Sequence, residues 1–175
     1  ATIGKALSFA GDYDLVLVAD ATYNETDLDF NGRKIYLKGV DHNTSGQCPV
    51  IDCQSSGGAF YFSSGEVKDS VVDNFTIKNG SASDGGAICC DSSSPTITNC
   101  IFSGNGATGF SCGGAIGCWN SSNPIITNCV FSGNSAGYGG AISCRSSTPS
   151  ITNCIFSGNT GCWGGAIYCF KSSPS

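Results

Sequence analysis

The stretch Gly85-Gly-Ala-Ile-Cys-Cys90 is repeated, with small changes, through the second half of the chain. Further copies of Gly-Gly-Ala-Ile-x-Cys begin at Gly113, Gly139 and Gly164, and a degenerate copy begins at Gly57. The copies start 25 to 28 residues apart. Self-similarity at a period of this length indicates a repeat architecture, in which each unit stacks on its neighbours.

A second phrase, Ile-Thr-Asn-Cys-x-Phe-Ser-Gly-Asn, follows the first in step. It occupies residues 97–105, 126–134 and 151–159. Short apolar runs in each repeat are separated by Gly, Asn, Ser and Pro, and no window in the repeats has helical periodicity. A coil of 25–28 residues with this pattern predicts one turn of a parallel β-helix, in which strands of successive coils lie about 4.8 Å apart.

Stacking in register would place equivalent residues in rows along the molecule. We therefore expect Ile88 and Cys90 to face the interior. Two rows of stacked core cysteines are expected: Cys90, Cys118, Cys144 and Cys169, and separately Cys100, Cys129 and Cys154. Strand alternation predicts an outward row formed by Cys89, Gly117, Ser143 and Tyr168.

The asparagines of the second phrase predict bends between strands. Asn99 and Asn105, with their equivalents in later copies, would stack there, and their amides could bond to each other and to backbone groups. Because such a bend resets the strand parity, two orientations stay open for the second cysteine row. Either Cys100, Cys129 and Cys154 point inward, or the residues after them, such as Ile101, do.

The N-terminal part reads as a cap and entry coils. Residues 1–11 predict a short amphipathic helix whose buried face carries Ile3, Ala6, Leu7 and Ala10. Strands are predicted at residues 14–20, 34–38 and 50–51. Residues 67–79 form a degenerate copy of the second phrase, with Val71, Asp73 and Asn79 in the places of Ile97, Asn99 and Asn105. We expect one domain over residues 1–175, with residues 1–56 as cap and entry coils and residues 57–175 as repeat coils.

Charge is scarce and unevenly distributed. Charged residues make up 12% of the 175 residues, the formal net charge is −5, and only Asp84, Asp91, Arg145 and Lys171 are charged after residue 80. This balance disfavours nucleic acid as a partner. No apolar run reaches the roughly 18 residues that a membrane-spanning helix needs, so no membrane span is expected.

The Gly-Gly-Ala-Ile phrase, together with Phe-Ser-Gly-Asn at residues 102–105, 131–134 and 156–159, resembles the repeats of chlamydial polymorphic outer-membrane proteins. It is also similar to right-handed parallel β-helix repeats of bacterial surface proteins and adhesins. The resemblance covers roughly residues 57–175. It implies an all-β, right-handed parallel β-helix, or solenoid, of about five to six coils with an N-terminal cap. It also implies a secreted or surface-displayed, often adhesive, protein.

The 12 cysteines permit three interpretations. The two rows can be buried free thiols that fill the core, disulfides, or a binding site for a soft metal ion. Packing is the interpretation we adopt, so no metal ligand and no cofactor is assigned. Outside the rows, Cys48 and Cys53 are close enough in sequence for a possible disulfide.

One exposed row is a candidate ligand surface. The residue after the inner cysteine is Asp91, Trp119, Arg145 or Phe170 in successive copies, and Tyr168 lies beside Phe170. Aromatic side chains on a flat, weakly charged face can stack on sugar rings or anchor a partner protein. The expected partners are therefore glycans or proteins of a host or other cell surface, or further copies of the chain itself.

No catalytic residue is assigned, and the leading hypothesis is a non-enzymatic extracellular structural or adhesive module. An alternative is a polysaccharide-active β-helix enzyme that uses the N-terminal acids, Asp12 and Asp14 among them. A second alternative is a thiol-rich metal-binding solenoid. The sequence stops at Lys171-Ser-Ser-Pro-Ser175, partway through a repeat. Two explanations stay open: a piece of a longer protein, or an end that docks on the next copy in a head-to-tail filament.

Overall fold

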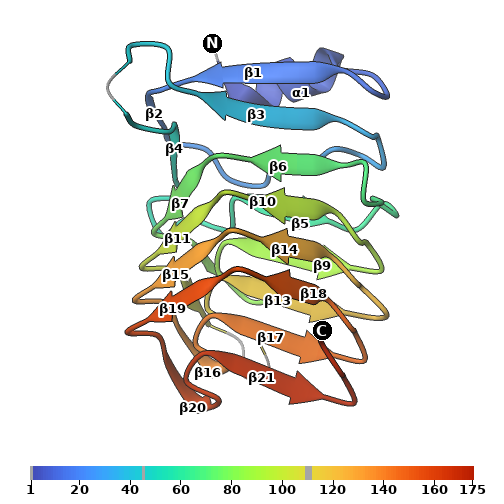
Figure 1. Cartoon of the computed structure of the whole chain (residues 1–175), viewed down its shortest axis with the longest axis vertical. Coiled ribbons are helices and arrows are strands. Elements are labelled where there is room, and N and C mark those ends of the chain that lie inside the picture. The colour runs from blue at the N-terminus through green and yellow to red at the C-terminus, as the bar shows by residue number, and fades with distance from the viewer. Residues whose placement is uncertain (1, 45, 109–111) are drawn as a thin grey trace.

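The computed structural model describes residues 2–44, 46–108 and 112–175. Its chain winds into a parallel β-solenoid of about six coils, with one short helix at the N-terminal end (Figure 1). Four sheets run along the stack, and every strand pairing within them is parallel. The predicted all-β fold with an N-terminal cap is confirmed.

Sheets A and B each contain six strands. Sheet A consists of β1 (Leu15–Ala19), β3 (Tyr36–Val40), β6 (Val71–Asp73), β10 (Thr96–Thr98), β14 (Ile125–Thr127) and β18 (Ser150–Thr152). Sheet B consists of β2 (Thr22–Tyr23), β4 (Val50–Asp52), β7 (Thr76–Lys78), β11 (Ile101–Ser103), β15 (Val130–Ser132) and β19 (Ile155–Ser157).

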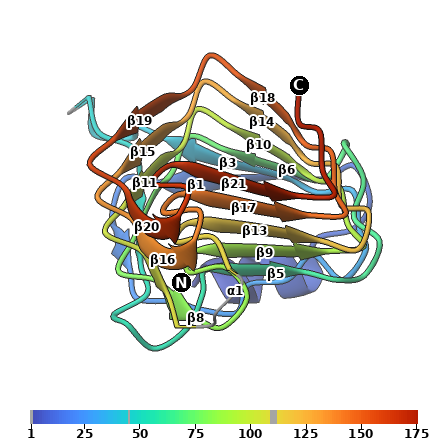
Figure 2. The same cartoon turned by 90° about the horizontal axis from the view of Figure 1, so that it is seen from below.

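Sheets C and D complete each coil. Sheet C consists of β5 (Phe60–Phe62), β9 (Ile88–Asp91), β13 (Ile116–Trp119), β17 (Ile142–Arg145) and β21 (Ile167–Phe170). Sheet D consists of β8 (Ser81–Ala82), β12 (Gly106–Ala107), β16 (Ser135–Tyr138) and β20 (Thr160–Trp163). Seen along the stack, sheets A, B and C enclose the core, while sheet D lies at the corner between B and C (Figure 2).

The first asparagine of the second phrase makes the bend between sheets A and B. Asn99, Asn128 and Asn153 have φ values of 53–54°, in the left-handed region that asparagine tolerates better than most residues. This bend resets the alternation of side chains. Cys100 and Cys129 are consequently buried, whereas Ile101 is 39% exposed, so the cysteine row is the one that points inward.

The second asparagine forms a buried ladder along the stack. Asn134 Nδ2 donates to Asn159 Oδ1 at 2.9 Å and to the Phe102 carbonyl at 3.1 Å. Its Oδ1 accepts from both Nδ2 and the backbone N–H of Asn105, each at 3.0 Å. Each amide therefore satisfies backbone groups of the coil before it, which buried backbone requires.

Apolar rows fill the space inside the ladder. The rings of Phe102, Phe131 and Phe156 stack with centroids 4.9 Å apart and planes inclined by 6°. In sheet C, Ile88 pairs in register with Ile116, which pairs with Ile142. A coil cannot bury its apolar side alone, so these rows supply the burial that holds neighbouring coils together.

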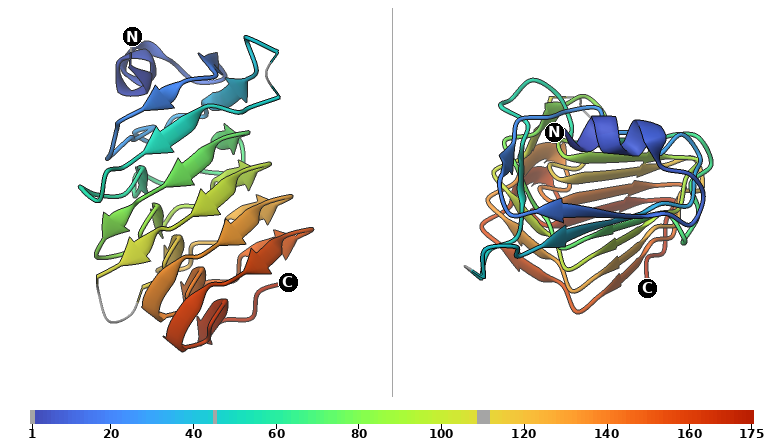
Figure 3. Two further views of the ribbon diagram at one scale, coloured as in Figure 1. Left: turned by 90° about the vertical axis from the view of Figure 1, so that its left-hand side faces the viewer. Right: turned by 90° about the horizontal axis from the view of Figure 1, so that it is seen from above.

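The helix α1 (Ile3–Phe9) lies along one edge of the N-terminal end of the stack, across from β1 (Figure 3). Ile3 and Leu7 are buried against the core, while Ala6, which the sequence placed on the buried face, is exposed. Glu25 holds the start of the helix, because its two carboxylate oxygens accept from the backbone N–H groups of Ile3 and Gly4 at 2.7 and 2.8 Å. A carboxylate at a helix N-terminus is also favoured by the helix dipole.

The register of the degenerate copy at residues 67–79 differs from the prediction by one residue. Val72, not Val71, pairs with Ile97. Asn74 takes the bend with φ 65°. Gly80, rather than Asn79, takes the ladder position, and its N–H donates to Asn105 Oδ1 at 2.8 Å.

Candidate functional site

The outer column comprises Asp91, Trp119, Arg145 and Phe170, one at the C-terminal end of each of β9, β13, β17 and β21. Trp119 pairs in register with Asp91, and Arg145 pairs with Phe170. Each follows an inward cysteine, so strand alternation turns the outer column toward the opposite side of sheet C.

Arg145 lies between two aromatic rings of the outer column. Its guanidinium carbon is 5.4 Å from the centroid of the Trp119 ring and 5.5 Å from that of Phe170. Guanidinium groups at this distance from an aromatic face are attracted by about 0.5–1 kcal/mol at exposed sites. The three side chains therefore form one stacked unit that crosses three coils.

The indole of Trp119 is held down at its other edge. Its Nε1 donates to the carbonyl oxygen of Asp84 at 3.0 Å. The ring passes directly over Gly117, because a Cβ built on Gly117 would lie 2.8 Å from Nε1. The pairing of Gly117 with Trp119 in one repeat is thus a steric requirement of the site.

The chain that enters sheet C crosses over the outer side of that sheet. A Cβ built on Gly113 would lie 2.6 Å from the backbone nitrogen of Ser143, one coil further on. This covering chain buries the row that the sequence predicted as outward: Cys89 is 5% exposed and Ser143 is 0% exposed. Cys89, Gly117 and Ser143 therefore lie on the outward side of sheet C but are buried beneath the covering chain. Burial raises the pKa of the Cys89 thiol to about 12, so it stays protonated at neutral pH.

Two aromatic residues that the row pattern of the repeats does not single out lie beside the outer column. Tyr138 and Trp163 end β16 and β20 and stack with ring centroids 6.2 Å apart. Tyr138 also meets Tyr168 edge to face, with centroids 4.7 Å apart. We call Tyr138, Trp163 and Tyr168 the aromatic flank. The sequence does contain a pattern that links two of these residues, because Tyr138 and Trp163 each directly precede a Gly-Gly pair.

The outer column and the aromatic flank together offer planar apolar faces with polar edges. Trp163 is 61% exposed and Phe170 is 43% exposed. Asp91, at the other end of the column, accepts a hydrogen bond from Asn120 Nδ2 at 2.7 Å. Rings fixed by stacking on neighbouring coils lose little conformational freedom when a ligand binds, which favours recognition of flat, partly apolar partners.

The two cysteine rows lie inside the solenoid. Register pairing joins Cys90 to Cys118, Cys118 to Cys144 and Cys144 to Cys169. The second row, Cys100, Cys129 and Cys154, follows the bend asparagines. Cys48 and Cys53, for which the sequence allowed a disulfide, are not bonded to each other. Cys48 Sγ instead lies 3.2 Å from Thr76 Oγ1.

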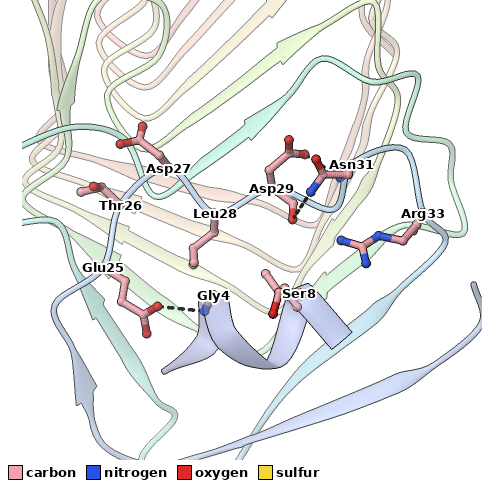
Figure 4. Close-up of a pocket in the computed structure, with 10 residues that line it drawn as sticks. Gly4, Ser8, Glu25, Thr26, Asp27, Leu28, Asp29, Asn31 and Arg33 are labelled. Carbon is pink, nitrogen blue, oxygen red and sulfur yellow. Dashed lines mark hydrogen bonds between the residues drawn. The ribbon is translucent and has the colours of Figure 1, made fainter. Parts of the chain in front are cut away.

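The N-terminal acidic side chains mostly accept hydrogen bonds from backbone N–H groups. Asp12 accepts from Lys34 N at 2.9 Å and Asp14 accepts from Gly11 N at 2.8 Å. A pocket of about 310 Å³ beside α1 is lined by Glu25, Asp27 and Asp29 (Figure 4). Glu25 turns toward the helix and Asp27 turns away from it, so their carboxylates do not converge (Figure 4).

Comparison with known proteins gives a family match and no close relative. A family model described as "Right handed beta helix region" matches residues 18–175. No curated protein and no solved structure matches the chain. Within the described ranges, no helix is long and apolar enough to cross a membrane.

Proposed function

Because the chain belongs to the right-handed β-helix family, we propose that it is a non-enzymatic, extracellular structural or adhesive solenoid. A fold alone does not specify a function, so the proposal depends on where exposed, pre-positioned side chains occur. The extracellular location is part of the proposal and rests on the resemblance of the repeat phrases to those of surface proteins.

The observation that carries the proposal is the stacked unit of Trp119, Arg145 and Phe170, with the aromatic flank beside it. Trp119, Arg145 and Phe170 stand at a position of the repeat where the residue type varies from coil to coil. The neighbouring Ile and Cys positions do not vary in this way, because their side chains pack in the core. Aromatic rings and arginine are the residues that most often anchor interfaces. We propose that this surface binds cell-surface glycans, whose sugar rings stack on exposed aromatic faces.

Binding of the purified chain to a glycan array and to intact cells tests the proposal. Replacing Trp163 or Phe170 with alanine removes an exposed ring, and we expect binding to fall at least tenfold. Phe9→Ala is the matched control, because Phe9 is also an exposed ring, 77% exposed with Lys5 Nζ 4.5 Å from its centroid, but lies on α1.

Equal losses in the Phe9 and Phe170 variants would argue against a site at the outer column. Binding to cells that survives removal of their glycans would assign the surface to a protein partner instead. Cleavage of a polysaccharide that is abolished in Asp12→Asn or Asp14→Asn would overturn the non-enzymatic part of the proposal.

A second candidate, self-association, is supported by the edge strands of the stack. β18 and β19 are edge strands of sheets A and B, and β1 and β2 are the opposite edges of the same sheets. Ile151 is partly exposed, whereas its equivalent Ile126 is buried. Head-to-tail docking of two copies would continue both sheets in parallel and cover that side chain.

Light scattering over a range of concentrations tests self-association. We expect mass to rise with concentration for the unmodified chain, and to remain that of a monomer for Ile151→Asp, which places a charge at the docking face. A monomer at the highest concentration of the unmodified chain would contradict head-to-tail assembly.

A further inference from the structure

Arg145 is the charged side chain of the outer column whose polar atoms have no partner among the described residues. Its guanidinium contacts the rings of Trp119 and Phe170, but within the described ranges it donates no hydrogen bond and forms no salt bridge. Asp91, the other charged member of the column, already accepts a hydrogen bond from Asn120 Nδ2. The N–H donors of Arg145 are therefore left for a ligand.

The two rings restrict how a ligand can reach this guanidinium. Trp119 and Phe170 belong to the coils before and after that of Arg145, so a ring lies on each side of it along the stack. Sheet C lies beneath, which leaves the solvent side as the approach to the N–H donors. Stacking also holds the side chain in place, so Arg145 loses little conformational freedom when a ligand binds.

The donors select an anion that can face a planar fork. A guanidinium matches a carboxylate with two parallel N–H···O bonds, and such charge-assisted bonds are about twice as strong as neutral ones. The ring of Phe170 is 43% exposed beside Arg145 and offers an apolar face to the sugar ring that carries the carboxylate. Together the two side chains fit an acidic sugar better than a neutral one.

The charges near the outer column favour a single carboxylate over a polyanion. Lys171 adds a second positive charge, with its Nζ 5.6 Å from the centroid of the Phe170 ring. Asp91 places a negative charge in the same column, two coils before Arg145. Since neighbouring strands lie about 4.8 Å apart, a chain with an acid on every sugar, laid along the column, would bring a carboxylate close to Asp91. One acidic sugar followed by neutral sugars avoids this repulsion.

We infer that the outer column, at Arg145 and Phe170, recognises glycans that end in one carboxylate-bearing sugar of the sialic acid class. The inference rests on the proposed glycan-binding function and names the class of its ligand. The carboxylate accepts hydrogen bonds from the guanidinium of Arg145, and the ring of the acidic sugar packs on Phe170. The neutral sugars that follow contact the aromatic flank, where Trp163 is 61% exposed.

Binding to one glycan array before and after sialidase treatment tests the inference, because sialidase removes the acidic sugar and leaves the rest of each glycan. We expect affinity to fall about tenfold or more after treatment, since hydrogen bonds to a charged group are lost. Arg145→Gln removes the charge and should bind treated and untreated glycans equally. Arg145→Lys keeps the charge without the planar fork and should restore only part of the preference.

Lys68→Gln is the matched control for charge. It removes an equal charge from a side chain that is 76% exposed and lies outside the outer column and the aromatic flank, so it should keep the full preference. An equal loss of preference in the Lys68 and Arg145 variants would overturn the inference, because the whole charge of the chain would then account for it.

Competition on the unmodified chain decides the question even if the Arg145 variants fail to fold. Sialyllactose should displace the chain from the array, whereas polygalacturonate and dextran sulfate, which carry charge on most sugars, should compete less well per charged group. Equal binding to treated and untreated glycans, or stronger competition by either polyanion, would overturn the inference and leave a glycan surface of another specificity standing. Binding to no glycan, treated or untreated, would overturn the proposed function as well.

Discussion

At the scale of single residues, the buried asparagines are the most demanding positions of the repeat. Asn134 is 0% exposed and takes part in four hydrogen bonds through its amide. Two of these bonds satisfy backbone groups of the preceding coil, the N–H of Asn105 and the carbonyl of Phe102. A buried backbone group that loses its partner costs about 1–3 kcal/mol, more than a typical hydrogen bond contributes when both partners are removed together.

Replacing Asn134 with alanine should lower the free energy of unfolding by about 2–4 kcal/mol, since the N–H of Asn105 and the carbonyl of Phe102 would both lose their partners. Urea denaturation measures the change. The control is Asn128→Gly, at an exposed bend with φ 54°, where glycine adopts the same backbone and only an amide contact of 3.4 Å is lost. That variant should change stability by less than about 0.5 kcal/mol, and similar losses in both variants would contradict the ladder's role.

Gly117 is required by contacts rather than by its backbone angles. A Cβ there would lie 2.0 Å from the carbonyl oxygen of Asp84, which is backbone and cannot rotate away. Gly117→Ala should therefore destabilise the fold by at least about 2 kcal/mol and displace Trp119, with a change in near-ultraviolet circular dichroism. Gly106→Ala is the control, since its nearest atom would be 3.6 Å away. A near-native spectrum for Gly117→Ala would contradict this account.

At the scale of strands and bends, the sequence predicts strand pairing and side-chain direction correctly wherever the spacing of the repeats is regular. In-phase phrases predicted the parallel stack and the inward position of Cys90, because in-register pairing follows from equal spacing. The same reasoning left Cys100 undecided, since the left-handed conformation of Asn99 decides which side chain turns inward. In the degenerate copy, the spacing predicts Asn79 one residue out of register, because Asn74 rather than Asp73 makes the bend that Asn99 makes in the later copy.

The candidate site was predicted only in part for a related reason. Trp119, Arg145 and Phe170 could be placed on one row from spacing alone. The burial of Cys89 and the contact of Tyr138 with Tyr168 could not, because both depend on the covering chain that folds back over sheet C. Strand periodicity reports which side of a sheet a residue faces, and says nothing of what lies against that side.

The cap helix depends on one side chain, Glu25, from the segment that follows β2. Removing the carboxylate in Glu25→Ala should lower the free energy of unfolding by about 1–2 kcal/mol, because two N–H groups at the start of α1 lose their acceptor. Glu25→Gln keeps one acceptor oxygen and should lose about half as much. Hydrogen exchange of the Ile3 and Gly4 amides reports the effect locally, and unchanged protection in Glu25→Ala would refute the capping role.

At the scale of the whole molecule, the buried thiols link stability to pH. Burial raises the pKa values of Cys53 and Cys89 to about 12, and a hydrogen bond with Cys100 together with burial does the same for Cys129. An unfolded thiol ionises near pH 8.5. The native state therefore keeps protons that the unfolded state releases, so this stabilisation is complete below about pH 8 and is lost as pH rises toward 12.

We expect the unfolding free energy, measured in urea with reductant present, to fall between pH 8.5 and 10.5 by about 1.4 kcal/mol per pH unit for each such thiol. Cys89→Ala should reduce the slope by about 1.4 kcal/mol per pH unit, because unfolding then releases about one proton fewer. Cys162→Ala, at an exposed thiol, is the control and should leave the slope unchanged. A slope that is the same in all three proteins would show that the buried thiols do not carry the pH dependence.

The parallel stacking of coils also determines how the molecule responds to force. Hydrogen bonds between neighbouring coils run along the long axis of the stack. Tension applied between the two ends therefore loads a few bonds at a time and peels off one coil after another. Tension applied across the stack, along the strands, instead loads every bond between two coils at once. Consider a solenoid that is anchored at one end and bound by a partner through the outer column on its side. It would unfold readily under tension along the stack and resist tension across the stack.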